Sequence, residues 1–441
     1  MIFLWLAIAI AIILLCILKL KLNPAIALVL GSLFMGIASG LTPIDTINTI
    51  TQGFGNLMVG LGLSVGFGVI LGQLLSDSGA AKKIADTLIS AASEKYAMYA
   101  LGLTAFILSI PVFYDVTFVI LVPLAIAVSK QLRKPVYYTV GAICIGAGTS
   151  HTLVPPTPNP IAAAEILHFD LGIMVGVGLV IGLVACVLAL KIFITVMDHG
   201  FWKKEIDELG ETPFQDVQEA SDVDSPCFLA SIVPVVLPVV LILLTTVWGA
   251  IGTVPSFVSF LGNKNIAMLL ALISAYIVAS KTMNRNEREV SATEALKSAG
   301  IVLLVTGAGG SFGAIISATG MADLIAACIS GISSNPLLAL IIAFFVAALF
   351  RIALGSGTVA SITTMTIMSS VSATLGINPV WIAIACLSGS LSCGHVNDSG
   401  FWVSTNLAGF SVTGGLKTYT FGNAIVAVIA MLFAMVGSFI F

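Results

Sequence analysis

Charged residues are scarce in this sequence, and their scarcity excludes an ordinary soluble protein. Only 9% of the 441 residues are charged and 58% are hydrophobic, whereas soluble globular proteins carry about 25% charged residues. Apolar runs of about 20 residues, the length that crosses a bilayer core as a helix, recur from end to end. The first run, from Ile2 to Leu18, lacks the basic start and the small-residue cleavage site of a signal peptide. We therefore expect an all-α polytopic membrane protein with about 12–14 membrane segments.

Paired cysteines and metal-ligand patterns are also missing. The seven cysteines are scattered without a CxxC pair, which favours small packing residues over disulfides or metal sites. His395 and Asp398 are one possible ligand pair, but they have no third partner. The sequence "LGSGT" (354–358) lies in an expected hairpin rather than in the helix that an intramembrane protease would need. We therefore expect neither a metal, nor a cofactor, nor an enzyme.

Acidic residues concentrate in one segment. Residues 198–224 hold nine of the 21 acidic residues, which is typical of a solvated linker. Because acids outnumber bases there, nucleic-acid binding is not expected. The segment divides the chain into a first repeat (1–196), a cytoplasmic charged linker (197–227) and a second repeat (228–441).

The two halves resemble each other at an offset of 241 residues. "GQLLSDSGAAKKIA" (72–85) aligns with "GAIISATGMADLIA" (313–326), and at the same offset Asp115 aligns with Ser356. The basic loops at 82–83 and 130–134 have no basic counterpart in the second half, and the reverse holds for the bases between 281 and 297. Since Lys and Arg mark cytoplasmic loops, the matching segments lie on opposite faces. We therefore predict two inverted repeats.

Four polar interruptions break the apolar runs. "SIPVFYDVTFVILVP" (109–123) and "FRIALGSGTVASITT" (350–364) predict helical hairpins whose tips lie within the membrane. "GAGTSHTLVPPTPNP" (146–160), with four prolines in six residues, and "SLSCGHVNDSGFW" (390–402) predict broken helices. Broken helices at matching positions of inverted repeats indicate the binding site of a transporter.

The residue types at these interruptions indicate what the site binds. Half-helix N-termini attract anions, and the many hydroxyl and amide side chains suit a substrate rich in hydroxyl groups. No lysine lies in any interruption, and the nearest arginine is Arg351. We expect backbone N–H groups to hold a carboxylate, with a protonated histidine as a further donor.

The intramembrane ionisable residues are candidates for proton coupling. Inserting an aspartate at the bilayer centre costs about 3 kcal/mol of free energy, so we expect Asp115 and Asp398 to have a functional role. Asp398 could instead cap the following half-helix, and His151 and His395 could be structural histidines. Arg351 could equally be an interfacial anchor. The Gly-rich "GAGG" (307–310) predicts close helix packing rather than a nucleotide loop.

Four segments together resemble the gluconate permease family of bacterial proton symporters for sugar acids. They are "LSIPVFYDVTFVILVPL", "SHTLVPPTPNP", "LFRIALGSGTVA" and "GSLSCGHVNDSGFW", and they run in order along nearly the whole chain. The resemblance implies a homodimer with a scaffold domain and a transport domain, elevator-type alternating access, and a bacterial inner-membrane location. By position it implies these substrate-binding residues: Tyr114, Asp115, Thr117, His151, Thr152, Asn159, Gly355, Ser356, Gly357, Thr358, His395, Asn397, Asp398 and Ser399.

This sequence departs from the family pattern at three positions. Thr157 and Asn159 replace a histidine and a glycine of the usual PPHPGP, and Ser399 replaces the proline of HVNDPGFW. These changes alter the lining of the site, so the substrate stays open. We expect import of a gluconate-like sugar acid with protons through Asp115, Asp398, His151 or His395. The alternatives are a Na⁺-coupled carboxylate transporter and a permease for D-serine or a small hydroxy acid.

Overall fold

The computed structural model describes residues 2–93, 96–209, 225–319, 336–372, 376–396 and 398–440. Within these ranges the chain forms helices and no strand, apart from an isolated bridge between Glu208 and Phe410. The expectation of an all-helical membrane fold is therefore confirmed.

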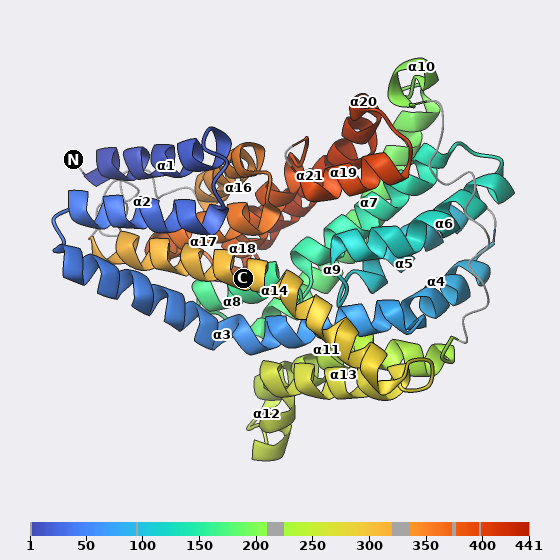
Figure 1. Ribbon diagram of the computed structural model, residues 1–441, viewed down its shortest axis with the longest axis horizontal. Coiled ribbons are helices and arrows are strands. Elements are labelled where there is room, and N and C mark those ends of the chain that lie inside the picture. Colours follow the sequence, from blue (N-terminus) through green and yellow to red (C-terminus); the bar gives the residue numbers. More distant parts are fainter. Residues whose placement is uncertain are drawn as a thin grey trace.

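Helices make up both halves of the chain (Figure 1). The first half contains α1 (Ile2–Leu18), α2 (Pro24–Ala38), α3 (Pro43–Asp77), α4 (Ala80–Ser90), α5 (Ala97–Leu108), α6 (Tyr114–Leu132), α7 (Val136–Leu153), α8 (Pro158–Ile166) and α9 (Leu171–Asp198). The short α10 (Lys204–Asp207) begins the linker. The second half contains α11 (Phe228–Ile251), α12 (Ser256–Gly262), α13 (Lys264–Ala279), α14 (Arg285–Ala318), α16 (Pro336–Leu354), α17 (Gly357–Ser372), α18 (Pro379–Ser392), α19 (Ser399–Leu407), α20 (Val412–Gly415), the π-helix η2 (Leu416–Thr420) and α21 (Phe421–Gly437).

The order of the elements repeats with the spacing seen in the sequence. Helix α8 spans residues 158–166 and α19 spans residues 399–407, each boundary 241 residues later. Helix α9 begins at residue 171 and α20 begins at residue 412, again 241 residues later. The hairpin α5–α6 corresponds to α16–α17 at a similar spacing, with boundaries that differ from the 241-residue offset by one to five residues. This spacing supports the internal repeat, and the domain boundaries at 196 and 228 stay predictions.

The long helices α3 and α14 are matching elements of the two halves, and they lie side by side in opposite directions (Figure 1). Ser291, near the start of α14, donates to Asp77 at the end of α3, whereas Ser311 donates to the backbone of Ile50 near the start of α3. A Cβ at Gly53 would lie 2.7 Å from the carbonyl oxygen of Gly310. The prediction that "GAGG" permits close helix packing is therefore confirmed.

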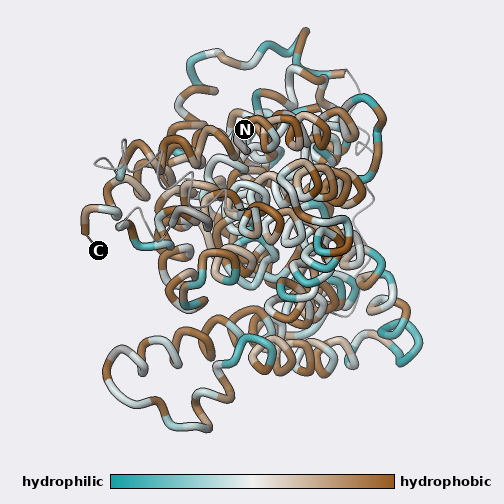
Figure 2. Tube along the Cα trace, turned by 90° about the vertical axis from the view of Figure 1, so that its left-hand side faces the viewer, coloured by the Kyte–Doolittle hydropathy of each residue, from teal (hydrophilic) through white to brown (hydrophobic). Residues whose placement is uncertain are grey.

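Apolar residues cover most of the helices, and polar residues gather mainly at their ends and connections (Figure 2). Three helices of the described residues are long and apolar enough to cross a membrane alone: Leu171–Asp198, Phe228–Gly249 and Val412–Gly437. Two bent pairs, Pro43–Gly60 with Gly62–Asp77 and Ser256–Gly262 with Lys264–Ala279, bend by 53° and 65° and raise the number to five. The predicted 12–14 segments also count shorter apolar helices, among them Ala97–Leu108 and Pro336–Ile352 of the hairpins and Pro379–Ser392 before the second break.

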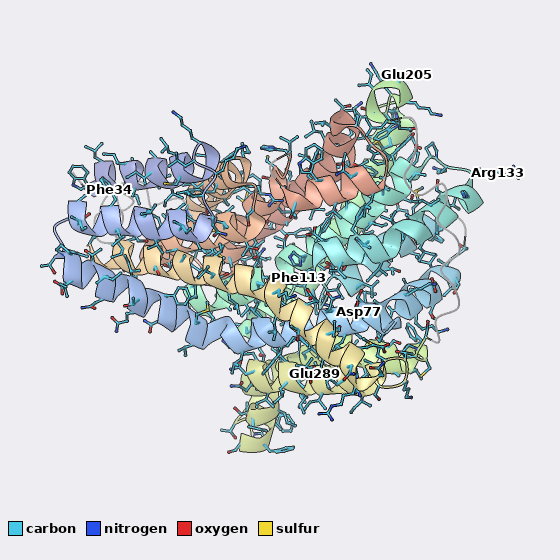
Figure 3. All side chains as sticks on the ribbon, in the orientation of Figure 1. Phe34, Asp77, Phe113, Arg133, Glu205 and Glu289 are labelled. Carbon is cyan, nitrogen blue, oxygen red and sulfur yellow. The ribbon has the colours of Figure 1, made fainter. Side chains whose placement is uncertain are left out.

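Both predicted hairpins reverse inside the protein. Helix α6 runs from Phe113, near the centre of the molecule, to Arg133 at its edge (Figure 3). Val112 at the first tip is 1% exposed. The second tip turns at Gly355, whose φ of 73° is a left-handed conformation that favours glycine. Such buried reversals are what a re-entrant hairpin requires, because the backbone at its tip must face protein or water rather than lipid.

Candidate functional site

Four helices begin around one cavity of about 650 Å³. They are α6 and α17, which follow the two hairpin tips, and α8 and α19, which follow the two helix breaks. Each start directs the positive end of a helix dipole at the wall, and α6, α17 and α19 also place backbone N–H groups there. Helix α8 begins Pro158-Asn159-Pro160, so only Asn159 among its first three residues has an N–H. The predicted convergence of half-helix N-termini is thus present, and its physical consequence is a site that favours an anion.

Most of the predicted substrate-binding residues line this cavity. The eleven that do so are Tyr114, Asp115, His151, Thr152, Asn159, Gly355, Ser356, Gly357, Thr358, Asp398 and Ser399. Thr117 is fully buried behind the first tip, and neither it nor His395 is among the lining residues. Asn397 lies outside the described residues. Asp77 and Glu165 pair elsewhere, with Ser291 and Lys264 respectively.

Arg351, near the end of α16, is an internal cation of this site. Its side chain is 7% exposed, so the alternative of an interfacial anchor is wrong. One terminal nitrogen, Nη2, donates to Asp398 Oδ2 and to the hydroxyl of Tyr419 at 3.1 Å, and Nη1 donates to the carbonyl of Gly355 at 3.1 Å. Arg351 therefore joins the second hairpin to the second helix break.

Asp398 has two structural roles at once. Its Oδ1 accepts the backbone N–H of Gly400 at 3.0 Å, so the predicted cap of α19 is confirmed. Its Oδ2 accepts from Arg351 and, at 2.6 Å, from the hydroxyl of Tyr419. The carboxylate is 9% exposed and is compensated by charge and by hydrogen bonds, which is the condition for keeping a charge buried.

Both halves of the cavity wall contain buried polar atoms without hydrogen-bond partners among the described residues. Four buried side-chain atoms at the cavity have no hydrogen-bond partner among the described residues: His151 Nδ1, Asn159 Oδ1, Arg351 Nε and Asn423 Oδ1. Asp115 also lines the cavity, and within the described ranges it has neither an ion pair nor a hydrogen bond. Buried polar atoms normally have partners, so these atoms indicate where a polar ligand can bond.

Sequence reasoning missed Tyr419 and Asn423. Both lie in the run Val412–Gly437, which is long and apolar enough to be taken for a plain membrane helix although Gly414 and Gly415 precede Tyr419. The structure places Tyr419 in the π-helix η2, which adds a residue to the turn. Single π turns occur often at functional sites, but the sequence contains no local signal for one.

The same π-helix is tied to the linker. Lys417 of η2 forms a 2.6 Å ion pair with Asp207 of α10, whose side chain is fully buried, and the backbone N–H of Lys203 donates to the same oxygen at 2.7 Å. Burial acts to raise the pKa of Asp207, but these hydrogen bonds and the charge of Lys417 outweigh it and lower the pKa. The start of the linker thus anchors the element that presents Tyr419.

The fold is similar to that of a membrane transport protein of known structure. MtrF of Neisseria gonorrhoeae, described as one of a class of antimetabolite efflux pumps, is similar in structure with a TM-score of 0.70. The match covers 94% of each chain at 14% sequence identity, so it supports the fold alone.

The family follows from the sequence comparisons. Residues 1–440 match the GntP family permeases. A high-affinity gluconate transporter of Escherichia coli (strain K12) is 31% identical, with 92% of each chain covered. A D-serine transporter of the same organism is also 31% identical, over 95% of this chain and 94% of that one. The chain belongs to the GntP permease family, and the predicted resemblance is confirmed.

Membership settles the class and the location. Permeases move solutes across a membrane and are not enzymes, so the chain is a member of a transport family. Its apolar helices and its inner-membrane relatives make it a multi-pass protein of the bacterial inner membrane.

Proposed function

We propose that the protein imports a gluconate-like sugar acid together with protons by alternating access. The observation that carries this proposal is the convergence of four helix N-termini and one guanidinium on a single cavity. Backbone N–H groups and Arg351 suit a carboxylate. The unpartnered amide and imidazole atoms of Asn159, Asn423 and His151 suit the hydroxyl groups of a sugar chain.

The transport movement is proposed by analogy with elevator-type carriers. Both hairpins and both broken helices contribute to the cavity, so they would move as one transport domain. The antiparallel pair α3 and α14 would belong to the scaffold of a homodimer. Protons would bind one of the four ionisable side chains predicted for coupling: Asp115, Asp398, His151 or His395.

D-serine is a second candidate substrate. A D-serine transporter is as similar to this chain as a gluconate transporter is. Asn159 and Ser399 support this candidate because they add an amide and a hydroxyl to the cavity. A small amino acid has a carboxylate for Arg351 and fewer hydroxyl groups to bond.

Uptake into proteoliposomes tests the proposal. Radiolabelled gluconate and D-serine are offered with an inward proton gradient, an inward Na⁺ gradient, or neither. We expect saturable gluconate uptake that the proton gradient stimulates and the Na⁺ gradient does not. Stimulation by Na⁺ alone would establish the Na⁺-coupled alternative, and flux that does not saturate would contradict a carrier. Protein-free liposomes are the control.

A further inference from the structure

We infer that Arg351 is the binding residue for the substrate carboxylate, and that it exchanges Asp398 for that carboxylate. In this inference, which rests on the proposed function, the released Asp398 takes up the co-transported proton. The exchange identifies one arginine and one aspartate as the coupling device, among several ionisable groups in the cavity.

Arg351 is placed to accept a second carboxylate. It is the only lysine or arginine among the described residues that line the cavity. A guanidinium has five N–H donors in a planar fork, and the Nε donor of Arg351 has no partner within the described ranges. Because Nε is itself buried, a ligand carboxylate that enters the cavity can bond it once the guanidinium shifts toward the ligand. It then competes with Asp398 for Nη2, because a two-point contact needs both nitrogens.

The exchange leaves Asp398 in a place that disfavours its charge. Its side chain is 9% exposed, and after exchange its remaining donors are the hydroxyl of Tyr419 and the backbone N–H of Gly400. For a buried carboxylate that has lost its cation, binding a proton costs less free energy than staying ionised. The proton comes from water and binds Oδ2, the oxygen that Arg351 leaves.

Other titratable groups face this centre from several elements, and each bears on the interpretation. They are Asp115 and Tyr114 at the start of α6, His151 on α7, Cys393 in the second break, and Tyr419 on η2. Asp115 is the strongest rival because it is a carboxylate on the same cavity. However, Asp115 has no paired cation that a ligand carboxylate could take from it, so a bound anion acts on Asp115 by electrostatic repulsion alone.

Proton uptake during binding separates these two aspartates. Purified protein in weakly buffered detergent solution is titrated with gluconate while the pH is recorded, and the affinity is measured between pH 5 and pH 8. For the wild type we expect about one proton taken up per gluconate bound, and an affinity that falls about tenfold per pH unit in the upper part of this range. In Asp398→Asn we expect gluconate binding without proton uptake and with a flat pH profile.

Two further variants complete the design. Asp115→Asn should still take up the proton, and Glu294→Gln, which removes an exposed acid of α14 outside the cavity, should behave as the wild type. Proton uptake that persists in Asp398→Asn, or that disappears in Asp115→Asn, would overturn the exchange. If Asp398→Asn does not purify as a folded protein, the same titration is carried out on the wild type with gluconamide. This neutral analogue should bind the wild type without proton uptake, and equal uptake with both ligands would contradict the inference.

The experiment distinguishes this inference from the proposed function. If the wild type binds neither gluconate nor D-serine, the proposed function fails. If it binds one of them without taking up a proton, carboxylate binding stands and the exchange is wrong.

Discussion

The two halves of the cavity wall differ in how their polar groups are satisfied. On the second-half wall, Arg351, Asp398 and Tyr419 bond one another. On the first-half wall, His151 and Asn159 each carry an atom without a partner among the described residues. The residues 241 positions before Arg351 and Asp398 are Ile110 and Thr157, so the ion pair has no counterpart across the repeat. The second-half wall therefore contains a compensated ion pair, whereas the first-half wall contains Asp115 without a cation, and both walls carry polar atoms without partners among the described residues.

Removing Arg351 from its pair with Asp398 should have the largest effect on gluconate uptake and on stability. Arg351→Gln leaves Asp398 buried without its cation, which costs about 3–5 kcal/mol, so we expect a lower melting temperature and a loss of gluconate uptake of about 100-fold or more. The double variant Arg351→Gln with Asp398→Asn removes both charges. It should regain the melting temperature but not the uptake, as measured by thermal unfolding and proteoliposome uptake. Uptake retained in Arg351→Gln would show that the arginine is structural.

Asn159 and Thr117 test the hydrogen bonding of the first-half wall. Asn159→Ala removes an amide that lines the cavity, and we expect about tenfold weaker gluconate binding, equivalent to one hydrogen bond, with little change in melting temperature. Thr117→Val is the matched control, since its hydroxyl is buried without a partner among the described residues and does not line the cavity. It should keep the affinity and should not lower the melting temperature. Equal losses in the two variants would contradict the assignment of Asn159.

Asp115 tests whether the first-half wall carries charge that acts on the substrate. Asp115→Asn removes a carboxylate that repels an anionic ligand across the cavity, so we expect gluconate to bind about threefold more tightly at pH 7.5. Binding of gluconamide, which has no charge, should stay the same. Weaker gluconate binding in Asp115→Asn would mean that the carboxylate bonds the substrate directly.

Asp207 should have the smallest effect on binding, because it contacts Lys417 of the π-helix that carries Tyr419 and does not line the cavity. Asp207→Asn weakens the pair with Lys417, so we expect a loss of about 2 kcal/mol of stability with unchanged gluconate affinity. Since the folded pKa of Asp207 is lowered, its contribution is complete above its unfolded pKa of about 3.9. It disappears as the pH falls through the lower folded pKa. Melting temperatures of wild type and variant should therefore differ at pH 6, and the difference should start to shrink only below about pH 4.

The same contrast explains what could be predicted from the sequence. Prolines, glycines and isolated polar residues in apolar runs are local signals, and they located both hairpins and both helix breaks. Eleven of the fourteen predicted residues consequently meet at one cavity. The pairing of Arg351 with Asp398, 47 residues away, depends on packing between separate helices. The positions of Tyr419 and Asn423 depend on a π turn, which leaves no mark in composition or periodicity.

The buried pair of Arg351 and Asp398 also determines the electrical character of the proposed cycle. In the empty cavity the two charges cancel. In the loaded cavity the substrate carboxylate cancels Arg351 while Asp398 is protonated and neutral, so these groups again carry no net charge. A charge that crosses the membrane gains or loses about 2.3 kcal/mol per 100 mV, but Arg351, Asp398 and the cargo together add no net charge to either crossing, and a charge on Asp115 would cross once in each direction and cancel over the cycle. A monoanionic sugar acid would thus enter without electric current, driven by the pH difference and its own gradient and indifferent to the membrane potential.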